Sequence, residues 1–441
     1  MCRISDWEKK TLGREGARGG ERVRGGNIDE WRREHRSPKL PPGPWCLPLL
    51  GSLPYLLLAT YRSSPTARDP HRLFELISRK YGTIFSLNVF GKVIVVLNTY
   101  EAVKEAFQNR LLNDRPPSPI LPDGVIFASG DSWKEQRRFS LVTLRGFGQS
   151  LEDQISTETK VLLDEFKRQK HEPFDPHRLL GNALSNVICS VIFGHRYEYT
   201  DEDFKELLAL LSEEVEFSAG GGIIIFFPST RYLLPKLFKA MEENNLFAAG
   251  SETTATTLRW AILYMMAYPD IHRRVQQEID IVVGRDRLPK LSDIPNLPYT
   301  GATLLELQRI VTITPSGIVH FAADDTILNG FSIPKGTFLI SNLWAVHHDP
   351  NVWEEPAQFN PSRFLDSSGN LLHRPELIPF STGRRICLGE NLAKVTLSLF
   401  FTHVMHQFTF TKPTDSSEIS FEGISGGTFQ PKPFKVVATL R

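Results

Sequence analysis

The sequence predicts a mainly α-helical protein with a small β portion, an α+β fold carried by one large domain. Helical periodicity dominates from residue 131 onward, whereas strand patterns are short and lie near the two ends of the chain. Motifs that carry chemistry are spread over the whole length. We therefore expect a single catalytic domain over residues 38–441, preceded by a charged, disordered tail over residues 1–37.

Two strands and a helix are expected first. Thr83–Asn88 and Lys92–Leu97 have the composition of strands and meet around Gly91, and Thr99 is the expected N-cap of a helix that runs to Phe107. The remaining predicted elements are helices at Asp131–Leu141, Leu151–Gln169, Leu179–Phe193, Asp203–Leu211, Leu246–Tyr268, Asp270–Val283, Tyr299–Val311 and Gly389–Gln407, and strands around Thr326–Ile333 and Thr337–Ile340.

The bulk composition narrows the class of protein. The chain has 51 Lys and Arg against 50 Asp and Glu, so no nucleic-acid partner is expected. Its four cysteines, Cys2, Cys46, Cys189 and Cys387, are far apart in sequence, which predicts reduced thiols rather than a disulfide framework. The apolar stretch Cys46–Thr60 is shorter than the roughly 20 residues that span a bilayer, so no transmembrane helix is expected.

The run FSTGRRICLG, which ends at Gly389, is the most informative pattern. Cys387 immediately precedes a predicted helix, whose N-terminus would stabilise a thiolate and make it a metal ligand. Gly383 and Gly389 permit tight turns and close approach of a flat cofactor. Phe380 would shield the sulfur, and Arg385 would pair with a carboxylate at the cofactor's edge. A lone cysteine is more often an inert buried one, but the spacing of the whole run favours the ligand.

The predicted helix at Leu246–Tyr268 has a polar interruption of Gly, Ser, Glu and Thr. Hydroxyl groups that bond back to carbonyls would open this helix locally and leave room for dioxygen and water. Thr253 would then hydrogen-bond the oxygen, and Glu252 would supply protons. The alternative is an ordinary helix N-cap at Ser251, and this segment alone does not choose between the two. Pro269 would end the helix.

Three further sets of residues are candidates. Glu306 and Arg309 share a helix face and are flanked by apolar residues, which predicts a partly buried pair with a structural role. Trp133 and Arg137 stand at i and i+4 on one helix, either as cofactor donors or as part of a surface helix. His320 follows Pro315-Ser316-Gly317, and a lone histidine is more often structural.

These patterns together resemble the cytochrome P-450 family. The run F-x-x-G-x-R-x-C-x-G resembles its haem-binding signature, and A-G-x-E-T-T, E-x-x-R, W-x-x-x-R and P-x-R-F resemble its other motifs. The resemblance implies the P-450 fold, haem b (iron protoporphyrin IX) with Cys387 on the iron, and Arg363 as third member of the Glu306–Arg309 cluster. It also implies that Trp133, Arg137 and His320 bind the haem propionates.

The resemblance runs from about Pro41 to the C-terminus and is strongest to animal microsomal enzymes of the second P-450 family. It implies a monooxygenase that uses O2, a lipophilic small-molecule substrate (fatty acid, arachidonate-type lipid or xenobiotic) and an NADPH-dependent flavoprotein reductase. It further implies the cytoplasmic face of the endoplasmic reticulum membrane. Phe217–Phe227 is a candidate for peripheral membrane contact, and Lys134, Arg138 and Arg384 are candidates for attracting the reductase.

One departure from the family pattern concerns the ability of this chain to catalyse a reaction. Residues 233–245 lead almost at once into the oxygen-activating helix, where the family has several dozen more residues that roof the pocket. An internal deletion is therefore expected near 233–245. Because of this expected deletion, a catalytically impaired haem-binding isoform remains an alternative. A haem-thiolate peroxide isomerase is a third hypothesis, against which the intact Glu252–Thr253 pair argues.

Overall fold

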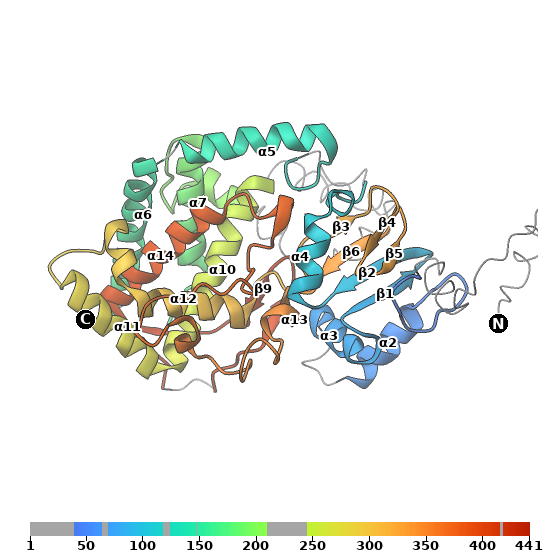
Figure 1. Cartoon of the computed structure of the whole chain (residues 1–441). Coiled ribbons are helices and arrows are strands. Elements are labelled where there is room, and N and C mark those ends of the chain that lie inside the picture. Colours follow the sequence, from blue (N-terminus) through green and yellow to red (C-terminus); the bar gives the residue numbers. More distant parts are fainter. Residues whose placement is uncertain (1–38, 64–68, 118–123, 147, 210–244, 415–417) are drawn as a thin grey trace, which may run out of the picture. The chain divides into compact units, whose positions relative to one another are not determined.

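About half of the described residues are helical, and a small sheet lies apart from the main group of helices (Figure 1). This computed structural model describes residues 39–63, 69–117, 124–146, 148–209, 245–414 and 418–441. Leu40–Arg441 forms one compact unit. The predicted α+β class is confirmed. The tail at 1–37, the membrane segment at Phe217–Phe227 and nearly all of 233–245 lie outside the described residues.

The helices that the sequence predicts are present to within a few residues at each end, whereas the helices at Leu53–Arg62, Pro70–Tyr81 and Leu343–His347 were not predicted. Thr99 caps its helix as predicted, since its hydroxyl accepts from the Ala102 N–H at 3.4 Å. The helices are α2 (Leu53–Arg62), α3 (Pro70–Tyr81), α4 (Tyr100–Gln108), α5 (Gly130–Arg145), α6 (Gly148–Arg168), α7 (His177–Phe193), a helix at 202–209, α10 (Asn245–Ala267), α11 (Pro269–Val283), α12 (Pro298–Val311), α13 (Leu343–His347) and α14 (Glu390–Gln407).

The strands form one four-stranded sheet, in the order β1-β2-β6-β3, and three two-stranded pairs. The predicted strand at Thr326–Ile333 is instead a hairpin, β4 and β5, because Asn329 and Gly330 both adopt positive φ and reverse the chain. The strands are β1 (Ile84–Val89), β2 (Lys92–Leu97), β3 (His320–Phe321), β4 (Thr326–Leu328), β5 (Phe331–Ile333), β6 (Phe338–Ser341), β7 (Phe408–Thr411), β8 (Gly423–Ser425), β9 (Phe429–Pro431) and β10 (Val437–Leu440).

The sheet is covered on both faces, which explains why β2 is a continuous apolar run rather than an alternating one. Val95 and Leu97 pack in the cluster that contains the apolar residues of α4. Ile94 and Val96 point the other way and pack with Leu73 of α3. β2 runs antiparallel to β1 and parallel to β6, so residues from both ends of the chain share this sheet.

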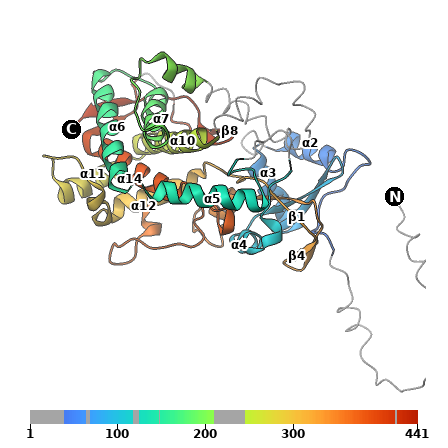
Figure 2. The ribbon, with the colours of Figure 1, turned by 90° about the horizontal axis from the view of Figure 1, so that it is seen from above.

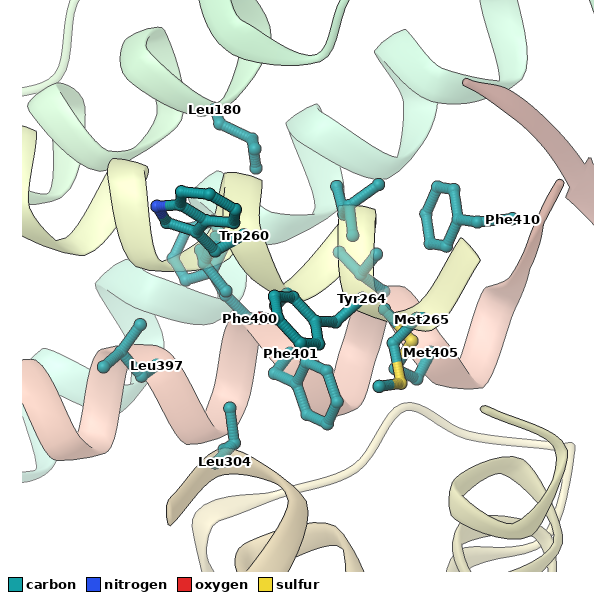
Figure 3. Packing of buried hydrophobic residues seen from close by; sticks show 14 of the residues in the cluster. Leu180, Trp260, Tyr264, Met265, Leu304, Leu397, Phe400, Phe401, Met405 and Phe410 are labelled. Atoms are coloured by element: carbon teal, nitrogen blue, oxygen red, sulfur yellow. The ribbon is translucent and has the colours of Figure 1, made fainter. Parts of the chain in front are cut away.

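The main core surrounds α10. Every residue from Thr254 to Met266 is buried, as in a helix that is apolar on all sides. Figure 3 shows Tyr264 and Met265 of this helix next to Phe401 and Met405 of α14, whereas Trp260 lies nearer Leu180 of α7. α5 projects from the helices toward the sheet in both views (Figures 1 and 2), where it meets the elements that carry the predicted cofactor contacts.

Two predictions about α10 have different outcomes. The helix ends at Ala267, and Pro269 begins α11, as predicted. The hydroxyls of Thr253 and Thr254 do bond back to the carbonyls four residues before them, at 2.8 and 3.2 Å. The helix nevertheless remains continuous, because these hydroxyls share the carbonyls with the backbone instead of displacing it. Within the described parts of the chain, no helix combines the length and the hydrophobicity needed to cross a bilayer.

Candidate functional site

The loop that carries Cys387 is closed by its own backbone. The Cys387 N–H donates to the Phe380 carbonyl at 3.0 Å, and Gly383–Arg385 form a 3-10 turn, η7, between them. Gly383 has φ +76°, and a Cβ there would lie 2.3 Å from the Phe107 carbonyl oxygen of α4. Glycine is therefore required here because two backbones pack directly against each other. Phe380 supplies this closing carbonyl, and its ring is half-buried.

The Cys387 thiol has a pKa above its usual value, which differs from the expected effect of a helix N-terminus. Burial is the largest cause, and the Glu390 carboxylate adds to it. The Gly389 N–H, which donates to the sulfur, and the nearby Arg137 act in the opposite direction. The side chain is still accessible to solvent. A free thiol is therefore favoured until a metal ion supplies the remaining positive charge, as it does for other thiolate ligands.

Buried donors without partners gather beside this loop. Trp133 Nε1 and Arg385 Nη1 are buried, and neither has a hydrogen-bond partner among the described residues. The Arg385 guanidinium lies 3.9 Å from the centre of the Trp133 ring, and its other donors bind the carbonyls of Asn113 (2.9 Å) and Ala128 (2.7 Å). Buried N–H groups are nearly always paired in proteins. Two unpaired donors next to one another therefore indicate a place for an acceptor.

Arg115 belongs to the same group, although no sequence motif pointed to it. It is buried, and its Nη1 donates to the carbonyls of Ile318 and Val319, both at 2.9 Å. Burial lowers the pKa of Arg115 to about 9, with a further contribution from the charge of Arg385, and burial lowers that of Arg385 to about 10. Among the described residues neither arginine forms an ion pair. Two buried cations of this kind favour an anionic ligand.

Arg137 and His320 complete the predicted cofactor contacts. Arg137 Nη2 donates to the Ile386 carbonyl of the cysteine loop at 2.7 Å. The His320 ring stacks on Phe107 (3.8 Å between centroids), and its Nδ1 donates to the Leu112 carbonyl at 3.0 Å. Burial lowers the pKa of His320 well below its usual value. A neutral His320 thus keeps only a lone pair at Nε2, and it could donate there only if a nearby carboxylate raised its pKa.

Glu252 and Thr253 are neighbours on α10, but no hydrogen bond joins their side chains in the described structure. The Thr253 hydroxyl donates to the Ala249 carbonyl at 2.8 Å. Glu252 Oε1 accepts from Thr256 at 2.8 Å and from the side-chain amide of Gln430, on β9, at 2.9 Å. Burial raises the pKa of Glu252 above its usual value. This carboxyl group therefore holds a proton more readily than an exposed glutamate.

Close packing fixes the first turns of α10. A Cβ on Gly250 would lie 2.8 Å from Cδ1 of Ile188 on α7, so α7 and α10 are closely packed here and a larger residue would require the Ile188 side chain to move. Phe247 packs in a small cluster that also contains Leu392, which lies in the first turn of α14, five residues after Cys387. The segment with Glu252 is thus linked to the helix that follows the thiol. The role of Gly250 was not predicted, because its partner is far away in sequence.

Glu306, Arg309 and Arg363 come together in the described structure. Both side chains of the Glu306–Arg309 pair are 0% exposed, and the pair is bidentate, with N···O distances of 2.7 and 2.8 Å. Arg363, on the 3-10 turn η6 (Pro361–Phe364), adds a third contact at 3.2 Å. Arg309 Nη1 also donates to the carbonyls of His347 and Pro356. The cluster ties α12 to the loops after α13.

The donor set fits a planar, doubly anionic cofactor that brings its own metal ligands. No group of three or more His, Cys, Asp or Glu in the described residues could hold a bare metal ion. One cysteine sulfur can instead complete the coordination of an iron already held by a porphyrin. The unpaired Trp133 and Arg385 donors, with the uncompensated charge of Arg115, match the carboxylates at a porphyrin's edge.

The fold and this site together define a haem protein of the thiolate-ligated class. The family profile described as Cytochrome P450 matches the chain at residues 41–244 and 239–438. The chain belongs to the cytochrome P450 family. Membership makes it a haem monooxygenase by class.

Several mammalian proteins are similar to this chain over most of their length. It is 34% identical to Cytochrome P450 2U1 of Homo sapiens, in an alignment that covers 93% of this chain and 91% of that protein. It is 38% identical to Cytochrome P450 2J3 of Rattus norvegicus, with 92% and 93% covered, and 36% identical to Cytochrome P450 2J2 of Homo sapiens, with 93% of both covered. These relatives confirm the resemblance to the second P-450 family.

Proposed function

We propose that this chain inserts one oxygen atom of O2 into a lipophilic organic substrate, with electrons that come from NADPH through a flavoprotein reductase. The observation that carries the proposal is the position of Cys387 ahead of α14, beside the unpaired buried donors of Trp133 and Arg385. Fatty acids, arachidonate-type lipids and xenobiotics are the proposed substrates, by resemblance to the second P-450 family.

The proposed cofactor is haem b with Cys387 bonded to iron. When bound, the haem supplies an iron centre that binds and activates O2. The chain offers no Cys-x-x-Cys-His sequence for covalent attachment of haem, which supports the non-covalent haem b. Phe380, Gly383 and Gly389 shape the loop around the sulfur. The proposed propionate donors are Trp133, Arg137, His320 and Arg385, to which the structure adds Arg115.

Glu252 and Thr253 are the proposed proton-handling pair. Glu252 is a partly buried carboxyl group whose pKa is raised by desolvation, so it holds a proton more readily than an exposed glutamate. The Thr253 hydroxyl is held by the Ala249 carbonyl and would turn toward an oxygen ligand when one is present. A peroxide isomerase needs no such pair, so we favour a monooxygenase over that alternative.

The reductase is proposed to dock over the cysteine loop and α5. Arg138 and Arg384 are exposed cations on this face, and Arg384 lies 5.8 Å from the centre of the Trp133 ring. Phe139 is 73% exposed beside them. Lys134 is exposed but paired with Asp131 at 2.7 Å, so it contributes less free charge than the sequence suggested. Such a surface suits an acidic partner.

Peripheral contact with the endoplasmic reticulum membrane is proposed through the segment before α3. Trp45, Leu49, Leu57 and Tyr61 are between 50% and 90% exposed, and α2 buries none of its residues. Contiguous exposed apolar side chains of this kind mark interaction surfaces.

A catalytically impaired haem-binding form is the second candidate, because two observations support a missing segment before α10. The family profile matches in two pieces that meet at residues 239–244. The alignments extend over 495 and 478 positions, more than the 441 residues of the chain, so gaps open within it. A shortened roof would admit water to the pocket and separate oxygen consumption from product formation.

The absorption spectrum of the reduced, carbon monoxide-treated protein tests the central claim. We expect the Soret band typical of thiolate ligation, and we expect Cys387→Ala to abolish it. Turnover with NADPH, reductase and a long-chain fatty acid then separates the monooxygenase from the impaired form. Thr253→Ala should lower product formed per O2 consumed by about tenfold.

Two results would overturn these assignments. A purified chain that contains no porphyrin, or that binds it through a nitrogen ligand, would rule out the role of Cys387. Unchanged coupling in Thr253→Ala would rule out the role of Thr253. Haem binding with O2 consumption but no product would favour the impaired form.

A further inference from the structure

The carboxylate of Glu252 is held at one of its two oxygens. Oε1 accepts from Thr256 (2.8 Å), Gln430 (2.9 Å) and Thr428 (3.5 Å). Within the described residues no hydrogen bond reaches Oε2. A carboxyl group held in this way has a fixed orientation and one oxygen that remains available for a proton.

Gln430 differs from the other two donors because its amide also binds a buried cation. Arg259, two turns along α10 from Glu252, is buried, and its Nη1 donates to Gln430 Oε1 at 3.3 Å. Its Nη2 donates to the Pro431 carbonyl at 3.4 Å. No ion pair joins Arg259 and Glu252 in the described structure. The Gln430 amide therefore lies between the cation and the carboxylate and bonds to each.

The backbone next to Gln430 is anchored to α10 and to the segment after α12. The Trp260 indole N–H donates to the Phe429 carbonyl at 2.8 Å, and the Phe429 N–H donates to the Ile313 carbonyl at 2.7 Å. The Phe429 ring stacks on Trp260 with 5.8 Å between centroids. β9 is thus fixed against α10 one residue before Gln430, which sets the position of its side chain.

We propose that Gln430 is a positioning residue: it orients the Glu252 carboxylate and keeps it apart from Arg259, so that Glu252 remains a carboxyl group able to gain and lose a proton. This inference rests on the proposed role of Glu252 in proton handling. Direct contact with Arg259 would hold Glu252 as a permanent anion in a buried ion pair. Without the amide, the carboxylate would lose the donor that fixes Oε1.

Few charged groups surround Glu252. Arg259 is the one that acts on it directly, and it lowers the pKa, whereas burial raises it and has the larger effect. Asp175, just before α7, acts on Arg259, and Arg259 in turn lowers the pKa of His177; neither Asp175 nor His177 is among the groups that shift Glu252. A substitution at Gln430 can therefore change the pKa of Glu252 in two ways. Loss of the hydrogen bond from Gln430 raises this pKa, whereas a closer approach of Arg259 lowers it.

The test measures the protonation of Glu252 directly, in the haem-loaded protein at rest. Infrared difference spectra over a pH series give the carboxyl band that Glu252→Gln removes, and the midpoint of that band is the pKa of Glu252. Gln430→Leu cannot donate but still occupies the space between Arg259 and Glu252, so only the hydrogen bond to Oε1 is lost and we expect this midpoint to rise by about one unit. Gln430→Glu keeps the size and the contact with Arg259, and its negative charge should raise the midpoint further.

Turnover supplies a second measurement. Reductase-driven product formed per O2 should fall by about tenfold in Gln430→Leu, whereas turnover driven by an organic hydroperoxide, which brings its own oxygen and needs less proton delivery, should remain within twofold. Lys432→Met is the matched control on the same hairpin, since Lys432 is exposed and bonds only to Glu422. It should leave both the midpoint and the coupling unchanged.

An unchanged or lowered Glu252 midpoint in Gln430→Leu would overturn the inference. The infrared measurement needs no catalysis, so it fails or succeeds independently of the proposed monooxygenase activity. If Gln430→Leu does not fold, Gln430→Met takes its place, because methionine also lacks a donor and matches the length of glutamine. Loss of hydroperoxide-driven turnover in step with reductase-driven turnover would also count against a role in proton positioning.

Discussion

The buried cluster of Glu306, Arg309 and Arg363 permits a quantitative prediction about stability. In Glu306→Gln the side chain keeps its shape but loses its charge, and one acceptor oxygen becomes an NH2 group that faces arginine donors. Four hydrogen bonds reach the carboxylate: two from Arg309, one from Arg363 and one from the Asn360 N–H. Both members of the central pair are 0% exposed. Removing one partner of such a pair costs about 3–5 kcal/mol, since the other charge stays buried without compensation.

Urea unfolding followed by far-ultraviolet circular dichroism measures this loss. With an m-value of about 3 kcal/mol per molar urea or more for a domain of this size, the midpoint should fall by roughly 1 M. Glu75→Gln is the matched control, because Glu75 and Arg79 form a Glu–Arg pair on α3 at 2.9 Å with side chains 30% and 70% exposed. Its free energy of unfolding should stay within about 0.5 kcal/mol of that of the wild type. Equal midpoints for Glu306→Gln and the wild type would refute the argument that this cluster stabilises the fold.

Three further predictions follow from the site. Gly383→Ala should reduce haem incorporation and destabilise the chain by at least about 1–3 kcal/mol, because its Cβ would lie 2.3 Å from the Phe107 carbonyl oxygen at a φ of +76°; normal haem content would contradict this. Trp133→Phe keeps an aromatic ring beside Arg385 but removes the unpaired Nε1 donor. Haem transfer from this variant to apomyoglobin should therefore be about tenfold faster. An unchanged rate would show that no carboxylate binds at Trp133 Nε1. Burial raises the pKa of Glu252, so the wild type loses stability as the pH rises through that pKa. The melting temperature of Glu252→Gln should therefore rise relative to that of the wild type between pH 5 and pH 8. A difference that stays constant over this range would argue against a titrating Glu252.

The fold was predictable where local patterns and burial agree. β2 has the bounds expected from its apolar run, and α4 begins at the cap expected from Thr99. Where β4 and β5 form a hairpin, the sequence pattern predicts one strand, because the two-residue turn Asn329-Gly330 lies within a short apolar segment. The apolar periodicity alone does not indicate such a turn; the Asn-Gly pair has to be recognised as a turn sequence.

The site was predictable where residues act through short spacings. Glu306 and Arg309 on one helix, and Trp133 and Arg137 on another, are recognisable from i+3 and i+4 intervals. Arg115 and Gln430 were missed, since their partners are far away in sequence: Arg115 binds carbonyls near residue 318, and Gln430 binds Glu252. The direction of the Cys387 pKa was also missed, because the effect of burial exceeds that of the helix N-terminus and is visible only in three dimensions.

The parallel pairing of β2 with β6 has a consequence for synthesis on the ribosome. Ile94 pairs with Phe338, so the sheet cannot close until about 240 further residues have been translated, which takes roughly 12–50 s at usual rates. During that interval the apolar surfaces of β2, α3 and α4 have no partner strand. The nascent chain therefore depends on a chaperone or another temporary cover to avoid aggregation before its C-terminal third emerges.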